Sequence, residues 1–170
     1  MQKKIKTKKV NSGRRRSLSR LMAIQIFYQY DFLGDKKKLN EIKNDVIENY
    51  AINSDENISS YREKIDEEFL NNLISGLALN VEKIDAEISN LLQKGWEFEN
   101  LDDVVKQVLR FGALELQFML DTPLKVIINE YVDIAASFFD SKKVTFVNGL
   151  LENLAKKFRE HGTAHMPNKK

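Results

Sequence analysis

The sequence predicts an all-α protein of about seven helices, and three observations support this fold class. Glycine and proline, the residues that most strongly interrupt helices, number only seven and two in 170 residues. Apolar residues recur at spacings of three and four, which is the period of one helix face. No stretch of useful length alternates between apolar and polar residues as a half-buried strand does. The chain length suits one domain with a core of its own.

The first half of the chain is expected to form three helices. The first runs from about 14 to 33 and ends at Gly34, and its apolar side chains follow the spacing of one helix face. The second covers residues 38–50. Residues 51–60 are polar and predict a loop, after which the third helix covers residues 61–80.

The second half is expected to form four more helices. The fourth covers segment 84–95, and Asn100 is a suitable N-cap for the fifth. The sixth begins at Pro123, because proline is well tolerated at the first helical position, and Thr122 serves as its cap. The seventh covers residues 144–158.

Charge divides the chain into an arm and a body. The first twenty residues carry nine Lys and Arg and no acidic residue, whereas the remainder carries 18 basic and 25 acidic residues. We expect a disordered basic arm at 1–13, a single helical domain at 14–161 and a flexible tail at 162–170. A polyanion is the natural partner of such an arm, because neutralised phosphates release their condensed counterions.

The positive charge continues from this arm into the first predicted helix at Arg14, Arg15, Arg16 and Arg20. Cations at a helix N-terminus oppose the helix dipole, so three consecutive arginines there favour a functional role. Arginine also suits forked recognition of phosphate and stacking on bases. Single-stranded RNA fits at least as well as DNA, since no helix-turn-helix spacing is visible. An inert solubilising arm remains the alternative.

The composition argues against catalysis and against a cofactor. The chain has no cysteine, which excludes disulfides and thiolate chemistry. It has neither a glycine-rich phosphate loop nor a nucleophile beside a base. Its two histidines, His161 and His165, lack the further ligands that a zinc site needs. We therefore expect a non-enzymatic protein without a metal or cofactor.

The sequence also bears on where the protein acts. No segment approaches the roughly 20 apolar residues that span a bilayer. No apolar run with a cleavage site follows the basic N-terminus, as it would in a secretory signal. We expect a cytoplasmic protein with no membrane partner. A mitochondrial-type targeting peptide, which is likewise basic and poor in acidic residues, remains open.

Four segments, in the same order along the chain, carry a family resemblance. They read SRLMAIQIFYQYD (19–31), VLRFGALEL (108–116), PLKVIINEYVDIAASF (123–138) and FVNGLLENLAKKFR (146–159). These strings resemble the motifs of NusB, a family of bacterial transcription antitermination factors. The resemblance covers about residues 14–160, and its INE and FVNG motifs are specific in combination.

The resemblance implies an all-α fold of two packed three-helix subbundles with an extra helix. It also implies a non-enzymatic role in transcript elongation. Proteins of this family pair with NusE, which is also a small-subunit ribosomal protein, and the pair binds the boxA element of nascent ribosomal RNA. The pair helps to hold RNA polymerase in a termination-resistant elongation complex with other Nus factors.

The resemblance also assigns candidate RNA-binding residues near the start of the first helix and of the last helix. Arg20 matches an arginine of the family's first helix, and Arg16 matches a basic position four residues earlier. Arg14 and Arg15 fall where the family has basic or variable residues. Phe146 matches a phenylalanine near the RNA-facing start of the last helix.

Two departures from the family pattern affect the expected contacts. Relatives often carry a basic residue immediately before the phenylalanine, and we expect Lys142 and Lys143 to substitute for it here. Glu99 and Val105 fall on the segment that faces NusE. Some relatives have glutamate at the position of Val105, so the ionic detail of the partner contact differs in this chain.

Several polar residues of the motifs also have structural interpretations. Glu115 is expected to pair with Arg110 or with a donor on another helix, and Asn129 and Glu130 are expected to satisfy buried helix ends or each other. Gly149 is expected to allow close helix packing, since glycine within a helix costs about 1 kcal/mol relative to alanine.

Two other functions and one question of assembly remain open. The chain could be a protein-interaction adaptor that does not bind RNA. It could also be a stand-alone relative of the NusB-like domains that occur fused to RNA cytosine methyltransferases. The sequence does not decide between a monomer and a homodimer.

Overall fold

The computed structural model describes residues 11–33 and 39–160, and this part of the chain contains seven α-helices and no strand. The all-α prediction is confirmed. The helices are α1 (Ser12–Leu33), α2 (Leu39–Asn53), α3 (Ile58–Arg62), α4 (Glu67–Ser89), α5 (Asp103–Phe118), α6 (Leu124–Ala136) and α7 (Ser141–Ala155). A 3₁₀ turn, η2 (Phe98–Asn100), precedes α5, and a π-helical turn, η3 (Lys156–Glu160), follows α7.

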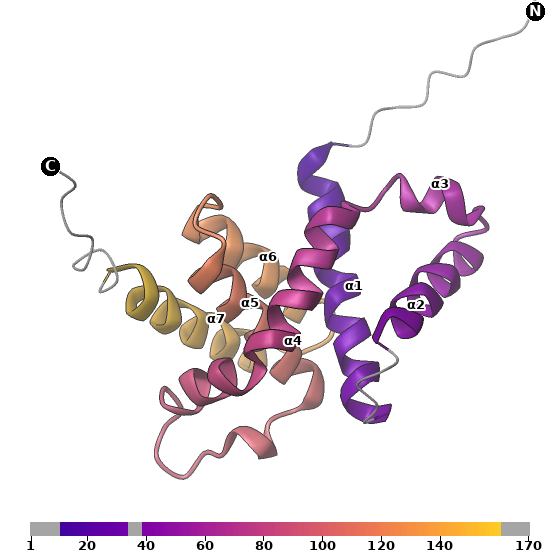
Figure 1. Ribbon diagram of the computed structural model, residues 1–170. Coiled ribbons are helices and arrows are strands. Elements are labelled where there is room, and N and C mark those ends of the chain that lie inside the picture. The colour runs from indigo at the N-terminus through magenta and orange to yellow at the C-terminus, as the bar shows by residue number, and fades with distance from the viewer. Residues whose placement is uncertain (1–10, 34–38, 161–170) are drawn as a thin grey trace, which may run out of the picture.

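The helices form two groups, with α4 between them. Figure 1 shows α1, α2 and α3 on one side of α4, with α5, α6 and α7 on the other side. Helix α5 packs against α1, α4, α6 and α7, so it occupies the centre of the fold. The expected tail at 162–170, both histidines and residues 1–10 of the expected arm lie outside the described residues. Helix α1 itself begins at Ser12, within the segment expected to form the arm.

The region around α4 differs from the prediction in two ways. The third and fourth predicted helices are one continuous helix, because buried Leu77 and Ile84 carry a single apolar stripe through the expected break. The Asp66 side chain caps its start by accepting from the Phe69 N–H. Helix α3 also falls partly within the segment expected to be a loop, and the side chain of its N-cap Asn57 accepts a hydrogen bond from the Ser60 N–H in the first turn.

The starts of α5 and α6 also differ from the prediction. Asn100 lies in η2, and Asp102 caps α5 by accepting a hydrogen bond from the Val104 N–H at 3.0 Å. Pro123 occupies the N-cap position of α6 with no side-chain bond, so neither it nor Thr122 plays the predicted part. Both corrections move a helix start by one or two residues.

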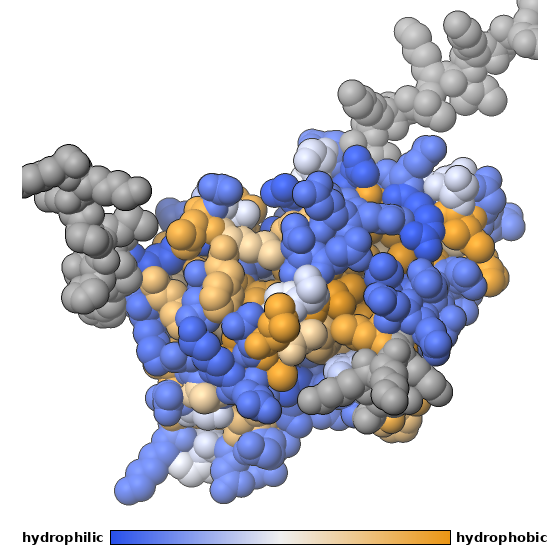
Figure 2. Space-filling view, viewed as in Figure 1, coloured by the Kyte–Doolittle hydropathy of each residue, from blue (hydrophilic) through white to orange (hydrophobic). Residues whose placement is uncertain are grey.

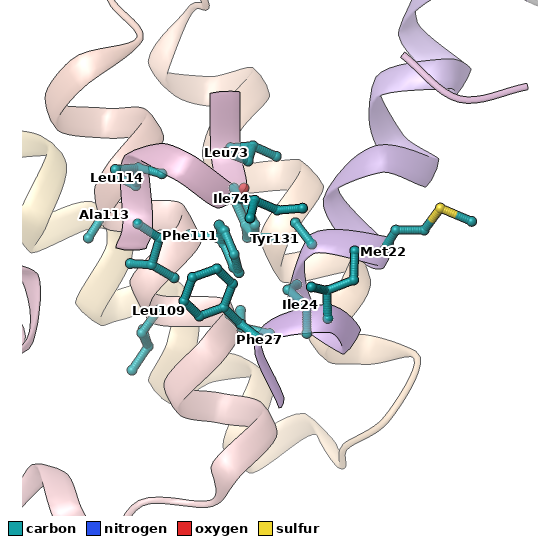
Figure 3. Packing of buried hydrophobic residues seen from close by; sticks show 14 of the residues in the cluster. Met22, Ile24, Phe27, Leu73, Ile74, Leu109, Phe111, Ala113, Leu114 and Tyr131 are labelled. Carbon is teal, nitrogen blue, oxygen red and sulfur yellow. The ribbon is translucent and has the colours of Figure 1, made fainter. Parts of the chain in front are cut away.

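The core is centred on α5, which is buried on nearly all sides between Val105 and Leu116. Figure 3 shows Phe111 of α5 beside Phe27 of α1, and their rings meet edge to face with centroids 5.3 Å apart. A Cβ at Gly112 would lie 2.5 Å from the Leu151 side chain, so glycine allows α7 to approach α5 at this point.

Gly149 does not have the role predicted for it. A Cβ at Gly149 would meet nothing within 4 Å, so the close approach of α5 and α7 depends on Gly112 instead. The FVNG motif therefore carries its glycine on an open side of α7. This side borders a groove that Trp96 and Phe146 also line.

The surface is largely hydrophilic on the face that Figure 2 shows, and apolar side chains gather near its middle. Leu79 of α4 is among the exposed apolar residues of the described chain. None of the described helices is both long and apolar enough to cross a bilayer. No group of three or more potential metal ligands occurs within residues 11–33 and 39–160.

Candidate nucleic-acid interface

The start of α1 presents three consecutive arginines in different environments. The Arg14 side chain is exposed and makes no ion pair or hydrogen bond with the described part of the chain. Arg15 donates to the Ile65 carbonyl at 2.7 and 3.1 Å. Arg16 remains half exposed while its Nε donates to Asp66 at 3.3 Å. The segment before α4 therefore fixes the helix start, and Arg14 and Arg16 keep surface for a ligand.

Arg20 lies one turn further along α1 but is buried, with 2% of its surface exposed. Its guanidinium donates to both Glu115 carboxylate oxygens at 2.8 and 2.9 Å. It also pairs with Glu130 at 3.2 Å, and the Tyr131 hydroxyl donates to Glu115 at 2.6 Å. This network joins α1, α5 and α6. In this conformation Arg20 holds helices together and does not reach the surface, where RNA would bind.

The network keeps Arg20 charged in neutral solution. Burial lowers the pKa of Arg20, but the hydrogen bond and charge of Glu115 outweigh that effect, and the pKa lies above its usual value. Burial also raises the pKa of the Tyr131 hydroxyl well above its ordinary range, so it stays protonated as a donor. Glu115 thus pairs with donors on other helices, which is one of the two predicted arrangements.

Arg110 takes part in a different cluster. It donates to both oxygens of Asp85 at 2.6 and 2.7 Å and also pairs with Asp31. Its guanidinium lies 5.3 Å from the centre of the Phe98 ring. These contacts connect α1, α4 and α5 to η2, and they support the connection that carries Trp96 and Glu99.

The start of α7 lines a groove with the segment that precedes α5. The groove has a volume of about 460 Å³. Its aromatic wall is a stacked pair formed by Trp96 and Phe146, with ring centroids 5.1 Å apart and an interplanar angle of 27°. The residues that line the groove are Trp96, Asn100, Leu101, Asp102, Val105, Lys142, Lys143 and Phe146.

The two lysines of this groove are not equivalent. Lys143 pairs with Asp102 at 3.3 Å, and its ammonium lies 4.6 Å from the centre of the Phe139 ring. The Lys142 side chain is exposed and has no ion pair or hydrogen bond within the described ranges. Lys142 is therefore the freer cation for an anionic ligand.

Part of the set expected to bind RNA and part of the set expected to bind the partner protein meet at this groove. Val105 is 3% exposed and lines it, while Glu99 is exposed on the adjoining η2 turn. Their positions in the sequence did not predict that these two sets would lie together. The structure brings Val105 beside Lys142 and Phe146, and it leaves the start of α1 outside this groove.

A second groove begins at the α1 arginines. It has a volume of about 700 Å³, and Arg14, Leu21 and Phe138 are among the residues lining it, between α1 and α6. Phe138 packs against Phe139, which in turn contacts Lys143 of the first groove. A band of surface therefore connects the cations of α1 with those of α7 through the end of α6.

Comparison with known proteins identifies the family of this chain. The sequence model of the NusB family matches residues 17–156. The chain belongs to the NusB family. A Caulobacter vibrioides relative called transcription antitermination protein NusB is 37% identical over 147 residues, which cover 85% of this chain and 95% of the relative. A Bradyrhizobium relative of the same name is 33% identical over 85% of this chain and 83% of its own length.

Solved NusB structures share the fold. T. maritima NusB superimposes with a TM-score of 0.70 at 27% identity, over 92% of this chain and 99% of that one. A crystal structure of the antitermination factors NusB and NusE in complex with dsRNA matches with a TM-score of 0.69 at 26% identity. That match covers 85% of this NusB-family chain and 98% of the other.

Trp96 is the aromatic residue of the groove that sequence reasoning missed. It lies in the polar segment QKGWEFEN, outside every predicted helix stripe, and it is the single tryptophan of the chain. The signal that could have identified it is a large aromatic residue among polar neighbours, directly after a glycine. The structure explains why a glycine precedes Trp96, because Gly95 has a φ of 93°, a conformation that favours glycine.

Proposed function

We propose that this chain is a transcription antitermination factor. It binds boxA-type single-stranded RNA of the ribosomal RNA leader together with NusE, and it supports elongation of ribosomal RNA operons by RNA polymerase with other Nus factors. The match of the NusB family over residues 17–156 carries this proposal. The likeness to a NusB protein crystallised with NusE and dsRNA supports both partners.

The charges of the described surface suit RNA. Arg14, Arg16 and Lys142 are exposed cations. An anionic ligand can pair with them without any rearrangement that exposes a buried charge. Phosphate contacts of this kind supply affinity without sequence preference. The α1 cluster and the groove would then hold different parts of one strand, with the surface near Phe138 between them.

A single strand suits the groove better than a duplex does. Unpaired bases can stack on aromatic side chains, whereas the bases of an A-form duplex stay stacked on each other and are read mainly by shape. Trp96 and Phe146 supply such side chains beside Lys142. NusE would contact the neighbouring Glu99 and the edge of the groove near Val105, so that both partners adjoin one surface.

A binding titration tests this function. The chain, alone and with NusE, is titrated against boxA-like single-stranded RNA, a scrambled strand of equal length, and the corresponding duplex. We expect the boxA-like strand to bind most tightly, and NusE to strengthen its binding more than that of the scrambled strand. Recovery of NusE with no RNA binding by either the chain or the pair would identify a protein adaptor and contradict the proposal.

A further inference from the structure

The Trp96 side chain is exposed to an extent unusual for tryptophan. It retains 54% of its surface, although Phe146 stacks against its ring. Phe146 therefore supports one face of the indole and leaves much of the ring open to solvent. An exposed aromatic ring with a rigid support can accept a second flat group by stacking.

The backbone around Trp96 is held in place. The Trp96 N–H donates to the Gln93 carbonyl at 2.9 Å, and the Asn100 N–H donates to Glu97 at 3.1 Å. Arg110, fixed by Asp85, lies over Phe98 in the same connection. Such support lowers the cost of ordering the ring when a ligand binds.

The surroundings favour a nucleotide over an apolar side chain of a protein. Lys142 and Lys143 line the same groove as Trp96, and Lys142 has no partner of its own within the described chain. The centre of a protein–protein interface is usually poor in lysine. A nucleotide instead brings a flat base for the indole and a phosphate for the ammonium group.

From this juxtaposition we infer that Trp96 is a stacking platform for one unpaired base of the bound RNA, with Lys142 beside the adjoining phosphate. The inference rests on the proposed RNA binding and adds a specific contact to it. The two aromatic residues then have different roles. Phe146 supports one face of the Trp96 indole, and the indole stacks on the base.

Intrinsic fluorescence tests the inference, because Trp96 is the chain's single tryptophan. The full chain with NusE is titrated with boxA-like RNA, and binding is followed in parallel by the anisotropy of labelled RNA. Stacking of a base on the indole quenches its emission, so we expect quenching that saturates together with binding. RNAs with one abasic nucleotide, moved along the strand, should lose the quenching at one position while they still bind.

Variants separate stacking from folding and from general aromatic character. We expect Trp96→Leu to weaken RNA binding about 5- to 150-fold, which corresponds to the loss of one base–aromatic stack. Trp96→Phe should keep most of the affinity. Phe118→Leu is the matched control, since Phe118 is 47% exposed with Lys83 5.6 Å from its ring, at the opposite end of α5. The Phe118→Leu variant should bind RNA with the affinity of the unmodified chain.

Three results would overturn the inference. RNA that binds with full affinity while emission stays constant at every abasic position would exclude stacking and leave the proposed function standing. A change of emission on adding NusE without RNA, and none on adding RNA, would make Trp96 a protein contact. Absence of RNA binding would remove the proposed function together with this inference. The abasic series changes only the RNA, so it decides the question even if Trp96→Leu fails to fold.

Discussion

Arg16 and Arg20 are four residues apart on α1, and their environments are opposite. Arg16 is half exposed with a surface partner, Asp66, whereas the Arg20 side chain is 3% exposed between Glu115 and Glu130. An exposed ion pair contributes about 0–1 kcal/mol to stability. A buried pair contributes differently, because removing one member leaves the other as an uncompensated charge.

This contrast predicts a difference in stability between two alanine variants. Arg20→Ala is expected to lower the free energy of unfolding by about 3–5 kcal/mol, since Glu115 would remain buried without its ion partner. Arg16→Ala serves as the matched control on the same helix and should cost no more than about 1 kcal/mol. Urea denaturation followed by circular dichroism measures both. Equal stabilities of the two variants would contradict the role given to Arg20.

The sequence identified the arginine-rich start of α1 but did not distinguish these two residues. Positions separated by four share a helix face, so spacing alone gives Arg16 and Arg20 the same exposure. Their difference depends on Glu115, which lies 95 residues away from Arg20 along the chain. A contact of that separation follows from the packing of α1 on α5, which no local pattern contains.

Among the elements, α5 and α7 show where close packing depends on glycine. We predict that Gly112→Ala lowers stability by about 1–3 kcal/mol, because its methyl group would collide with Leu151 in a filled core. Gly149→Ala is the control on the facing helix, and it should raise stability by about 0.5–1 kcal/mol, since open space surrounds that position. The measurement is again the free energy of unfolding. If the free energy of unfolding changed with the same sign in both variants, the close packing of α5 on α7 would not depend on Gly112 as described.

Helix content was more predictable than helix boundaries. The apolar spacing and the scarcity of glycine and proline indicated helices in nearly all the right places. The division of α4 was wrong because the polar residues near Asn80 lie on its solvent side and do not interrupt the buried stripe. The α5 cap was shifted because Asn100 and Asp102 are both good capping residues, and only the geometry of η2 selects Asp102.

At the scale of the whole molecule, the fold class and the family follow from the sequence, and the groove does not. Lys143 and Asp102 lie 41 residues apart, and their pairing depends on the packing of α7 beside the segment before α5. The sequence named Phe146 and both lysines of the groove but not Trp96. It also did not predict that Val105 would lie among them.

The whole surface, and not one residue, determines how binding responds to salt. Exposed cations of the α1 cluster and of the α7 groove would together engage about four to six phosphates. Each phosphate contact with a single strand contributes about −0.7 to the slope of log affinity against log salt concentration. The expected slope for the complete surface is therefore roughly −3 to −4.

The salt dependence of RNA affinity is therefore the most direct test of the proposed RNA interface. The variant Arg14→Ala/Arg16→Ala/Lys142→Ala removes three exposed cations and is expected to make the slope shallower by about 2 and to weaken binding. A control variant replaces two other exposed lysines, Lys83 and Lys156, and should leave the slope almost unchanged. A slope near zero for the unmodified chain, or the same slope and affinity in the triple variant, would contradict the interface.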